Sequence, residues 1–157
     1  MSEANHLRGS FETFYSVTRP RIFRAVALVL GNSDVALDAT EEAMTRAAER
    51  WGDVGRYDNP AGWVYRVALN WARTHLRQLA REGDGLKFEP GYEQSLPDPE
   101  LIDAVMALPT KYRAVIVARF FLDWPVEETA RVLEIPEGTV KTRTHRALKR
   151  LRMAIEE

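Results

Sequence analysis

The chain has 157 residues, 45% of them hydrophobic, and a formal net charge of −1; this suffices for a hydrophobic core and excludes a disordered protein. It contains no cysteine, which excludes a disulfide framework, a thiolate metal site and a catalytic thiol. The N-terminal residues carry no signal-peptide pattern, and the longest apolar run, residues 25–30, is too short to span a bilayer. A cytoplasmic protein is therefore expected.

The first half of the chain is predicted to form a helical bundle. Its apolar residues recur at turn spacing, and no segment alternates as a strand does. Pro20 is expected to open one helix, Gly31 to stop it, and Pro60 to precede the last helix of the bundle. The predicted helices cover residues 8–18, 20–30, 34–51 and 62–81.

A linker is predicted after this bundle, because residues 82–100 hold six acids and one Lys among Gly and Pro, with no periodicity. Further helices are predicted over residues 99–107, 110–122, 126–133 and 137–154. The fold class is thus all-α, with two small helical domains joined by a flexible acidic linker and a helix-turn-helix in the C-terminal domain. The predicted boundaries are 1–82 for the first domain, 83–99 for the linker and 100–157 for the second domain.

The helix-turn-helix is predicted over residues 126–152. Its first helix has an apolar face of Val126, Ala130 and Leu133, and Pro136 with Gly138 opens the second. The second helix should turn four apolar residues inward: Val140, Ala147, Leu148 and Leu151. Its other side is basic from residue 141 to 152 without any acid, which suits a recognition helix in the DNA major groove. The alternative is a solvated basic face on a packed helix.

The helix over residues 62–81 has two predicted faces. Val64, Val67, Ala68, Trp71 and Leu79 share the apolar one, in whose middle His75 is interpreted as a core histidine. The polar stripe suits nucleic acid, but on this stripe alone a solvated face is the favoured interpretation. Its four members are Arg66, Asn70, Arg73 and Arg77.

The loop before that helix pairs Arg56 with Tyr57, which could stack an unpaired base. The four Trp residues are interpreted as core or half-buried anchors instead. An acidic stripe on the helix over residues 34–51 has two open interpretations: favourable placement near the helix N-terminus, or a docking face for a basic partner. Its members are Asp38, Glu41, Glu42 and Glu49.

These pieces, in this order, resemble the extracytoplasmic-function sigma factors of bacterial RNA polymerase. In the C-terminal half, ALPTKYRAVIVARFF, EETARVLEIPEGTVKTR and RALKRLR resemble the family's domain for the minus-thirty-five element. In the N-terminal half, FYSVTRPRIFRAV, DATEEAMTRAAERW and NPAGWVYRVALNWAR resemble its domain for polymerase docking and the minus-ten element. The chain departs from the family pattern at Thr40-Glu41, Thr74 and Thr144.

The resemblance implies three sets of contact residues. Polymerase docking would use Asp38, Glu41, Glu42 and Arg46. Minus-ten DNA would be contacted by Arg56, Tyr57, Asn59, Arg66, Asn70, Arg73 and Arg77. Minus-thirty-five DNA would be contacted by Thr139, Lys141, Thr142, Arg143, His145, Arg146 and Lys149.

The implied partners are promoter DNA, the RNA polymerase core enzyme through its β′ clamp and β flap, and an anti-sigma factor. Neither a cofactor nor a metal is expected. No catalytic constellation occurs in the sequence, so the chain is not expected to be an enzyme. Two alternatives remain open: a stand-alone helix-turn-helix regulator, and a sigma-like helical adaptor that docks on polymerase without reading promoters.

Overall fold

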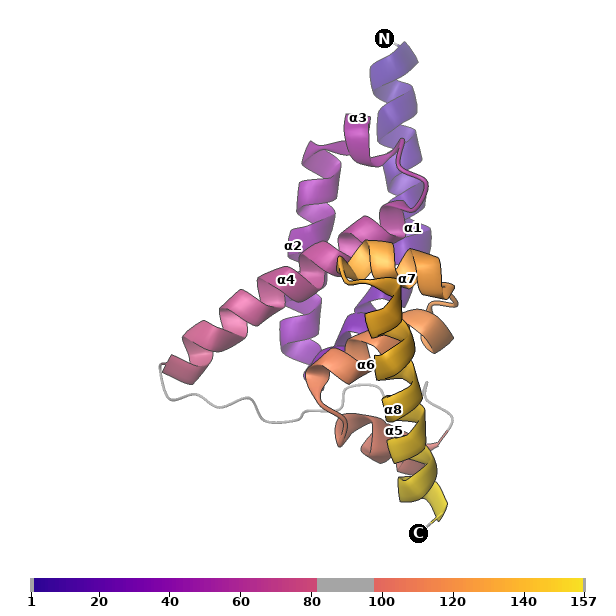
Figure 1. Cartoon of the computed structure of the whole chain (residues 1–157). Coiled ribbons are helices and arrows are strands. Elements are labelled where there is room, and N and C mark those ends of the chain that lie inside the picture. Colours follow the sequence, from indigo (N-terminus) through magenta and orange to yellow (C-terminus); the bar gives the residue numbers. More distant parts are fainter. Residues whose placement is uncertain (1, 82–97, 157) are drawn as a thin grey trace. The chain divides into compact units, whose positions relative to one another are not determined.

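The computed structural model describes the backbone of residues 2–81 and 98–156, and the side chains of residues 10–78 and 98–156 (Figure 1). Every regular element in these ranges is helical, so the predicted all-α class is confirmed. The predicted linker, apart from residues 98 and 99, lies outside the described residues. The elements are α1 (Ser2–Leu30), α2 (Ser33–Glu49), α3 (Trp51–Val54), α4 (Pro60–Arg81), α5 (Pro99–Met106), α6 (Thr110–Ile116), η1 (Val117–Phe121), α7 (Val126–Leu133) and α8 (Glu137–Glu156).

The chain divides into two compact units. One comprises Met1–Val26 with Asp34–Lys87, and is called the N-terminal unit below. The other comprises Ala27–Ser33 with Phe88–Glu157, and is called the C-terminal unit. None of the described helices is long and apolar enough to cross a membrane.

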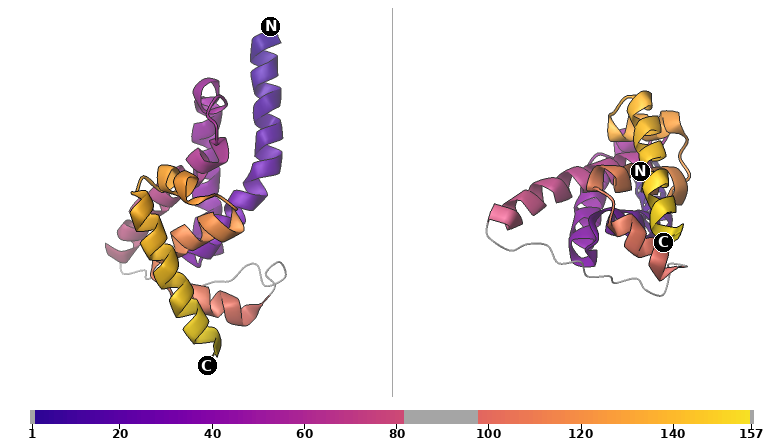
Figure 2. Two further views of the ribbon diagram at one scale, coloured as in Figure 1. Left: turned by 45° about the vertical axis from the view of Figure 1, so that its right-hand side comes forward. Right: turned by 60° about the horizontal axis from the view of Figure 1, so that its bottom comes forward.

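The first helix runs through Pro20 without interruption, so the predicted break between residues 18 and 20 is wrong (Figure 2). An internal proline costs about 3 kcal/mol, because it lacks an N–H and crowds the preceding turn. Pro20 itself is exposed, whereas Ile22 and Val26, two and six residues later, are buried at 1% and 0% exposure. Burying apolar side chains on one continuous helix outweighs the local penalty, since each contributes about 1.5–3 kcal/mol.

The core of the N-terminal unit is built largely from small residues. Helix α2 buries Ala36, Ala39, Ala43 and Ala47, and its Thr40 is also fully buried, with the hydroxyl donating to the Ala36 carbonyl over 2.7 Å. Such short side chains let neighbouring helix backbones approach closely. The helix predicted over residues 34–51 ends at residue 49 and is followed by the short α3.

Helix α3 seats Trp51 against the first helix. The Trp51 ring centroid lies 5.3 Å from that of Phe11 and 4.9 Å from that of Phe14. A Cβ added at Gly55, at the end of α3, would lie 2.9 Å from Trp51 Cε2 and 2.9 Å from the Trp51 carbonyl oxygen. Only glycine therefore fits at this point of close approach, where the chain leaves α3 for the loop before α4.

In the C-terminal unit, α8 packs against α5, α6 and α7 (Figure 1). The predicted helix-turn-helix is confirmed: α7 ends where Glu134 adopts a left-handed conformation (φ 56°), and α8 begins at Glu137. Ala130 and Val140 form a buried cluster with Val115 of α6, against which Val126 and Leu133 also pack. Ala147 and Leu151 join a second cluster, with Ala104, Leu108, Tyr112 and Ile116.

Two details of this unit differ from the sequence prediction. Leu148 is 38% exposed rather than turned inward, because it lies further around α8 than the buried Val140 and Ala147. The predicted helix over residues 110–122 is divided into the α-helix α6 and the π-helical segment η1. The bond from Leu122 N to Val117 O, 2.9 Å long, shows the wider i→i+5 spacing.

Candidate functional site

The two sides of α8 differ sharply in exposure. Val140 and Ala147 are fully buried, and Leu151 is 8% exposed. The candidate minus-thirty-five residues lie on the other side, as amphipathic spacing requires. Lys141, Thr142, His145, Arg146 and Lys149 are exposed, while Thr139 and Arg143 are half-buried.

An open hollow of about 300 Å³ lies between α6 and the first turns of α8. The structure brings four of the predicted residues together on its wall: Thr139, Thr142, Arg143 and Arg146. Lys141, His145 and Lys149 do not line it. Gly138 also lines the hollow, and the opposite wall comes from Lys111 and Tyr112 of α6.

Lys111 and Tyr112 are not among the functional residues predicted from the sequence. The Tyr112 ring is buried, with the Lys111 Nζ 5.5 Å and the Arg150 Cζ 4.9 Å from its centroid. A hydrogen bond from Arg146, together with the positive charges of Arg146, Arg150 and Lys111, lowers the pKa of Tyr112 below the usual tyrosine value. The helical spacing of residues 110–122 does not indicate that Lys111 and Tyr112 lie next to α8. In the sequence, only the positive charge of Lys111 could have indicated a functional residue here.

Thr144 lies behind this basic surface, at a position where the sequence departs from the family pattern. Its Oγ1 is buried and has no hydrogen-bond partner among the described residues. A buried hydroxyl without a partner costs about 1–3 kcal/mol of desolvation. An apolar side chain of similar size at position 144 would therefore stabilise the packing of α8 more than Thr144 does.

The polar stripe on α4 is present in the structure. Asn70, Arg73 and Arg77 are exposed and Arg66 is half-buried, whereas Val64 and Ala68 are fully buried on the opposite face. The Arg73 Nη2 lies 3.5 Å from the Asn70 Oδ1, a long contact that constrains the Asn70 side chain only weakly. The Leu79 side chain lies outside the described residues.

The histidine predicted for the apolar face of α4 lies at the edge of the core rather than within it. His75 is half-buried, and its ring stacks on Trp71 with centroids 4.8 Å apart and an interplanar angle of 10°. Trp71 is itself half-buried, which agrees with the interpretation of the Trp residues as anchors. No charged group pairs with His75 in the described structure.

The loop between α3 and α4 exposes two of its three candidate residues. Arg56 is exposed, and the Tyr57 side chain is 48% exposed. Asn59 instead accepts a hydrogen bond at Oδ1 from the Gly62 backbone N–H, at 2.9 Å. Asn59 thus caps the start of α4, and this bond fixes where the loop ends.

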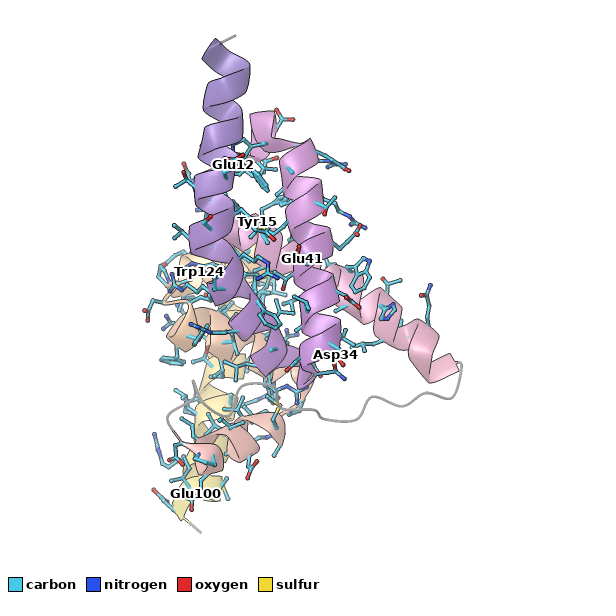
Figure 3. All side chains as sticks on the ribbon, turned by 180° about the vertical axis from the view of Figure 1, so that it is seen from behind. Glu12, Tyr15, Asp34, Glu41, Glu100 and Trp124 are labelled. Atoms are coloured by element: carbon cyan, nitrogen blue, oxygen red, sulfur yellow. The ribbon has the colours of Figure 1, made fainter. Side chains whose placement is uncertain are left out.

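The acidic residues of α2 have different surroundings. Asp38 is exposed, and Glu42 pairs with Arg46 one turn later, with 3.0 Å between Oε1 and Nε. Glu41 turns toward α1, where it forms an ion pair with Arg19 and accepts hydrogen bonds from the Tyr15 hydroxyl at 3.2 and 3.3 Å (Figure 3). The ion pair raises the pKa of Arg19. Glu41 therefore joins α2 to α1, in contrast with its neighbours.

Two family models match this chain. The family model described as Sigma-70 region 2 matches residues 8–82, and that described as Sigma-70, region 4 matches residues 99–151. The RNA polymerase sigma factor SigV of Bacillus subtilis is 30% identical over 85% of this chain and 83% of that protein. The ECF RNA polymerase sigma factor SigW of the same organism is 28% identical over 94% of this chain and 90% of that protein.

A further relative is the ECF RNA polymerase sigma factor SigL of Mycobacterium tuberculosis, 29% identical over 99% of this chain and 92% of that protein. The fold is shared with the sigma factor RpoE of Bartonella quintana, solved in complex with the anti-sigma factor NepR. The TM-score is 0.79, covering 93% of this chain and 96% of that chain, at 19% identity. The chain therefore belongs to the extracytoplasmic-function sigma factors of the sigma-70 family, which direct RNA polymerase to promoters in transcription initiation.

Proposed function

We propose that this sigma factor reads the minus-thirty-five element with α8 and the minus-ten element with α4 and the loop before it. The observation that carries the proposal is the exposed, acid-free basic face of α8, which lies opposite the buried Val140, Ala147 and Leu151. Phosphate contacts from such a face position the helix, and short polar side chains near its start can reach base edges. We propose domains at residues 1–82 and 100–157, joined by a linker at 83–99.

Run-off transcription from a mapped promoter by polymerase carrying this sigma factor tests the minus-thirty-five assignment. Arg143→Ala and Arg146→Ala should each cost about 1–3 kcal/mol in promoter affinity while core binding is retained. Arg152→Ala serves as the control, because it removes the same charge from an exposed site on the same helix outside the candidate set. Wild-type transcription by both candidate variants would contradict the assignment.

For the minus-ten element, we propose that the polar stripe of α4 holds the separated strand while the exposed Arg56 and Tyr57 flank an extruded base. Replacing Asn70 and Arg73 with Ala should then impair promoter opening more than closed-complex formation. A premelted template should restore much of the loss, because unpairing and base extrusion have already been accomplished. Equal permanganate reactivity of wild type and variant on duplex promoter DNA would contradict this role. The polar stripe would then be interpreted as a solvated helix face.

For polymerase docking, we propose that Asp38, Glu42 and Arg46 contact the β′ clamp and that Glu41 positions the helix that carries them. The support is the difference in surroundings: Glu41 is bonded to Arg19 and Tyr15, whereas Asp38 is exposed and Glu42 pairs with Arg46 of its own helix. Exposed charges contribute little to stability but steer a charged partner. Docking should therefore weaken with added salt.

The cellular setting follows from these partners. We propose that the chain acts in the cytoplasm, where core polymerase and promoter DNA meet, and that it supplies binding surfaces with no catalytic chemistry of its own. A regulator comparable to NepR, which binds RpoE in the solved complex, is proposed as a further partner. Such an anti-sigma factor would compete with polymerase for the sigma factor, so its addition should suppress run-off transcription.

A further inference from the structure

The hollow between α6 and α8 has an unusual electrostatic composition. Lys111, Arg143 and Arg146 all line it, and no carboxylate does. Neither Lys111 nor Arg143 forms an ion pair with an acid among the described residues. Three cations around one open hollow repel one another, and an anion placed among them would relieve that repulsion.

The polar groups of the hollow are suited to an oxyanion. Thr139 and Thr142 add hydroxyl donors beside Arg143, and the open volume of about 300 Å³ leaves room for a phosphate group that remains attached to a chain. Thr139, Thr142, Arg143 and Arg146 of the candidate minus-thirty-five set all line the hollow, and Thr142 and Arg146 are exposed. A backbone phosphate would therefore reach the hollow when α8 is seated in the major groove.

We propose that this hollow binds one backbone phosphate of the minus-thirty-five duplex, with Lys111 as a DNA contact outside the helix-turn-helix. The inference rests on the proposed role of α8. Because Lys111 lies on α6, it contacts the DNA from a second helix and fixes the angle at which α8 enters the major groove. Lys111 contributes to the orientation of α8 on the DNA and to the affinity for DNA of any sequence, because phosphates carry no base information.

Tyr112 acts in this arrangement as a positioning residue. Its buried ring is anchored among Ala104, Leu108 and Ile116, and Tyr112 lines the hollow together with Arg146, which lowers the pKa of Tyr112. Arg150 covers the ring at 4.9 Å from the centroid. The Tyr112 hydroxyl thus holds the Arg146 guanidinium at the wall of the hollow, so less side-chain freedom is lost when the phosphate binds.

The test uses holoenzyme reconstituted from core polymerase and the full chain, with promoter affinity measured as a function of salt. Each phosphate contact contributes about 0.9 to the slope of log affinity against log salt. Lys111→Ala should flatten that slope by about 0.9, so between about 50 and 200 mM salt the wild type should lose about 3.5-fold more affinity than the variant. The flattening should be the same for different minus-thirty-five sequences, and Lys111→Arg should preserve the wild-type slope.

Two further variants separate the outcomes. Arg152→Ala is the control for lost charge, because Arg152 is exposed on α8 but does not line the hollow. A slope for Lys111→Ala equal to that of wild type or of Arg152→Ala would overturn the phosphate site. If Arg143→Ala still weakened binding in that case, the proposed role of α8 would stand; if it had no effect either, both proposals would fail.

The positioning role of Tyr112 has its own readout. Tyr112→Phe keeps the buried ring but removes the hydroxyl, so the fold should persist while Arg146 loses its partner. Promoter affinity should fall several-fold, and the variant combining Tyr112→Phe with Arg146→Ala should be no weaker than Arg146→Ala alone. Independent, multiplicative losses from the two substitutions would show that Tyr112 does not act through Arg146.

Discussion

Glu41 offers a way to separate folding from docking on α2. Glu41→Ala removes the ion pair with Arg19 and both contacts with the Tyr15 hydroxyl, which join α2 to α1. Glu42→Ala is the matched change one residue later, and among the described residues it removes only the pair with Arg46 within α2. The two variants lose the same charge from the same helix.

The expected magnitudes follow from burial. The Arg19 and Glu41 side chains are 31% and 43% exposed, so their pair should be worth about 0.5–1 kcal/mol after screening. The hydrogen bond from Tyr15 to a charged, partly exposed acceptor should add about 1 kcal/mol. Glu41→Ala should therefore lower the free energy of unfolding by about 1–2 kcal/mol, against about 0.3–0.5 kcal/mol for the i,i+4 pair broken by Glu42→Ala.

Urea denaturation followed by circular dichroism measures these differences, and a double-mutant cycle of Arg19→Ala with Glu41→Ala isolates the pair. Its coupling energy should be about 0.5–1 kcal/mol. At temperatures where both single variants are folded, Glu42→Ala should weaken core-polymerase binding more than Glu41→Ala does. A Glu41→Ala variant of wild-type stability that fails to bind core polymerase would refute the positioning role.

Two stability predictions concern the loop before α4 and the support behind α8. Gly55→Ala should cost about 1–3 kcal/mol, because the new Cβ meets Trp51 at 2.9 Å, while Gly52→Ala, with nothing within 4 Å, should be neutral or stabilise α3 by up to about 1 kcal/mol. Thermal unfolding of the two variants side by side decides this, and equal midpoints would contradict it. Thr144→Val removes the unpaired buried hydroxyl without changing the side-chain shape, so it should raise the unfolding free energy by about 1 kcal/mol; a lower unfolding midpoint would show that the hydroxyl has a partner in solution.

The helix-turn-helix could be predicted from sequence because several local signals agree there. Apolar spacing, the helix-opening Pro136 and the acid-free outer face all point to the same two helices, and the structure places Ala130 and Val140 in one buried cluster. Leu148 was misplaced because a helical pattern defines a wide apolar stripe without defining its edges. Which residues at the margin are covered depends on the neighbouring helices, whose placement the pattern does not contain.

The features missed in the sequence depend on packing between distant segments. Pro20 is a local breaking signal that burial of Ile22 and Val26 on the same helix overrides. The π-helical segment at 117–121 has no compositional mark, since its wider turn depends on how the surrounding residues pack. The pairing of Glu41 with Arg19 joins residues 22 positions apart, and such contacts are invisible to helical periodicity.

Run-off transcription by core polymerase across a promoter library, with and without this chain, tests the central claim most directly. The chain should produce transcripts that start at a fixed distance downstream of a shared, asymmetric bipartite motif, and none of these should arise from core polymerase alone. Core binding without new transcripts would support an adaptor. Tight binding of the chain alone to palindromic DNA would support a stand-alone regulator. Either result would contradict promoter recognition through α8 and α4.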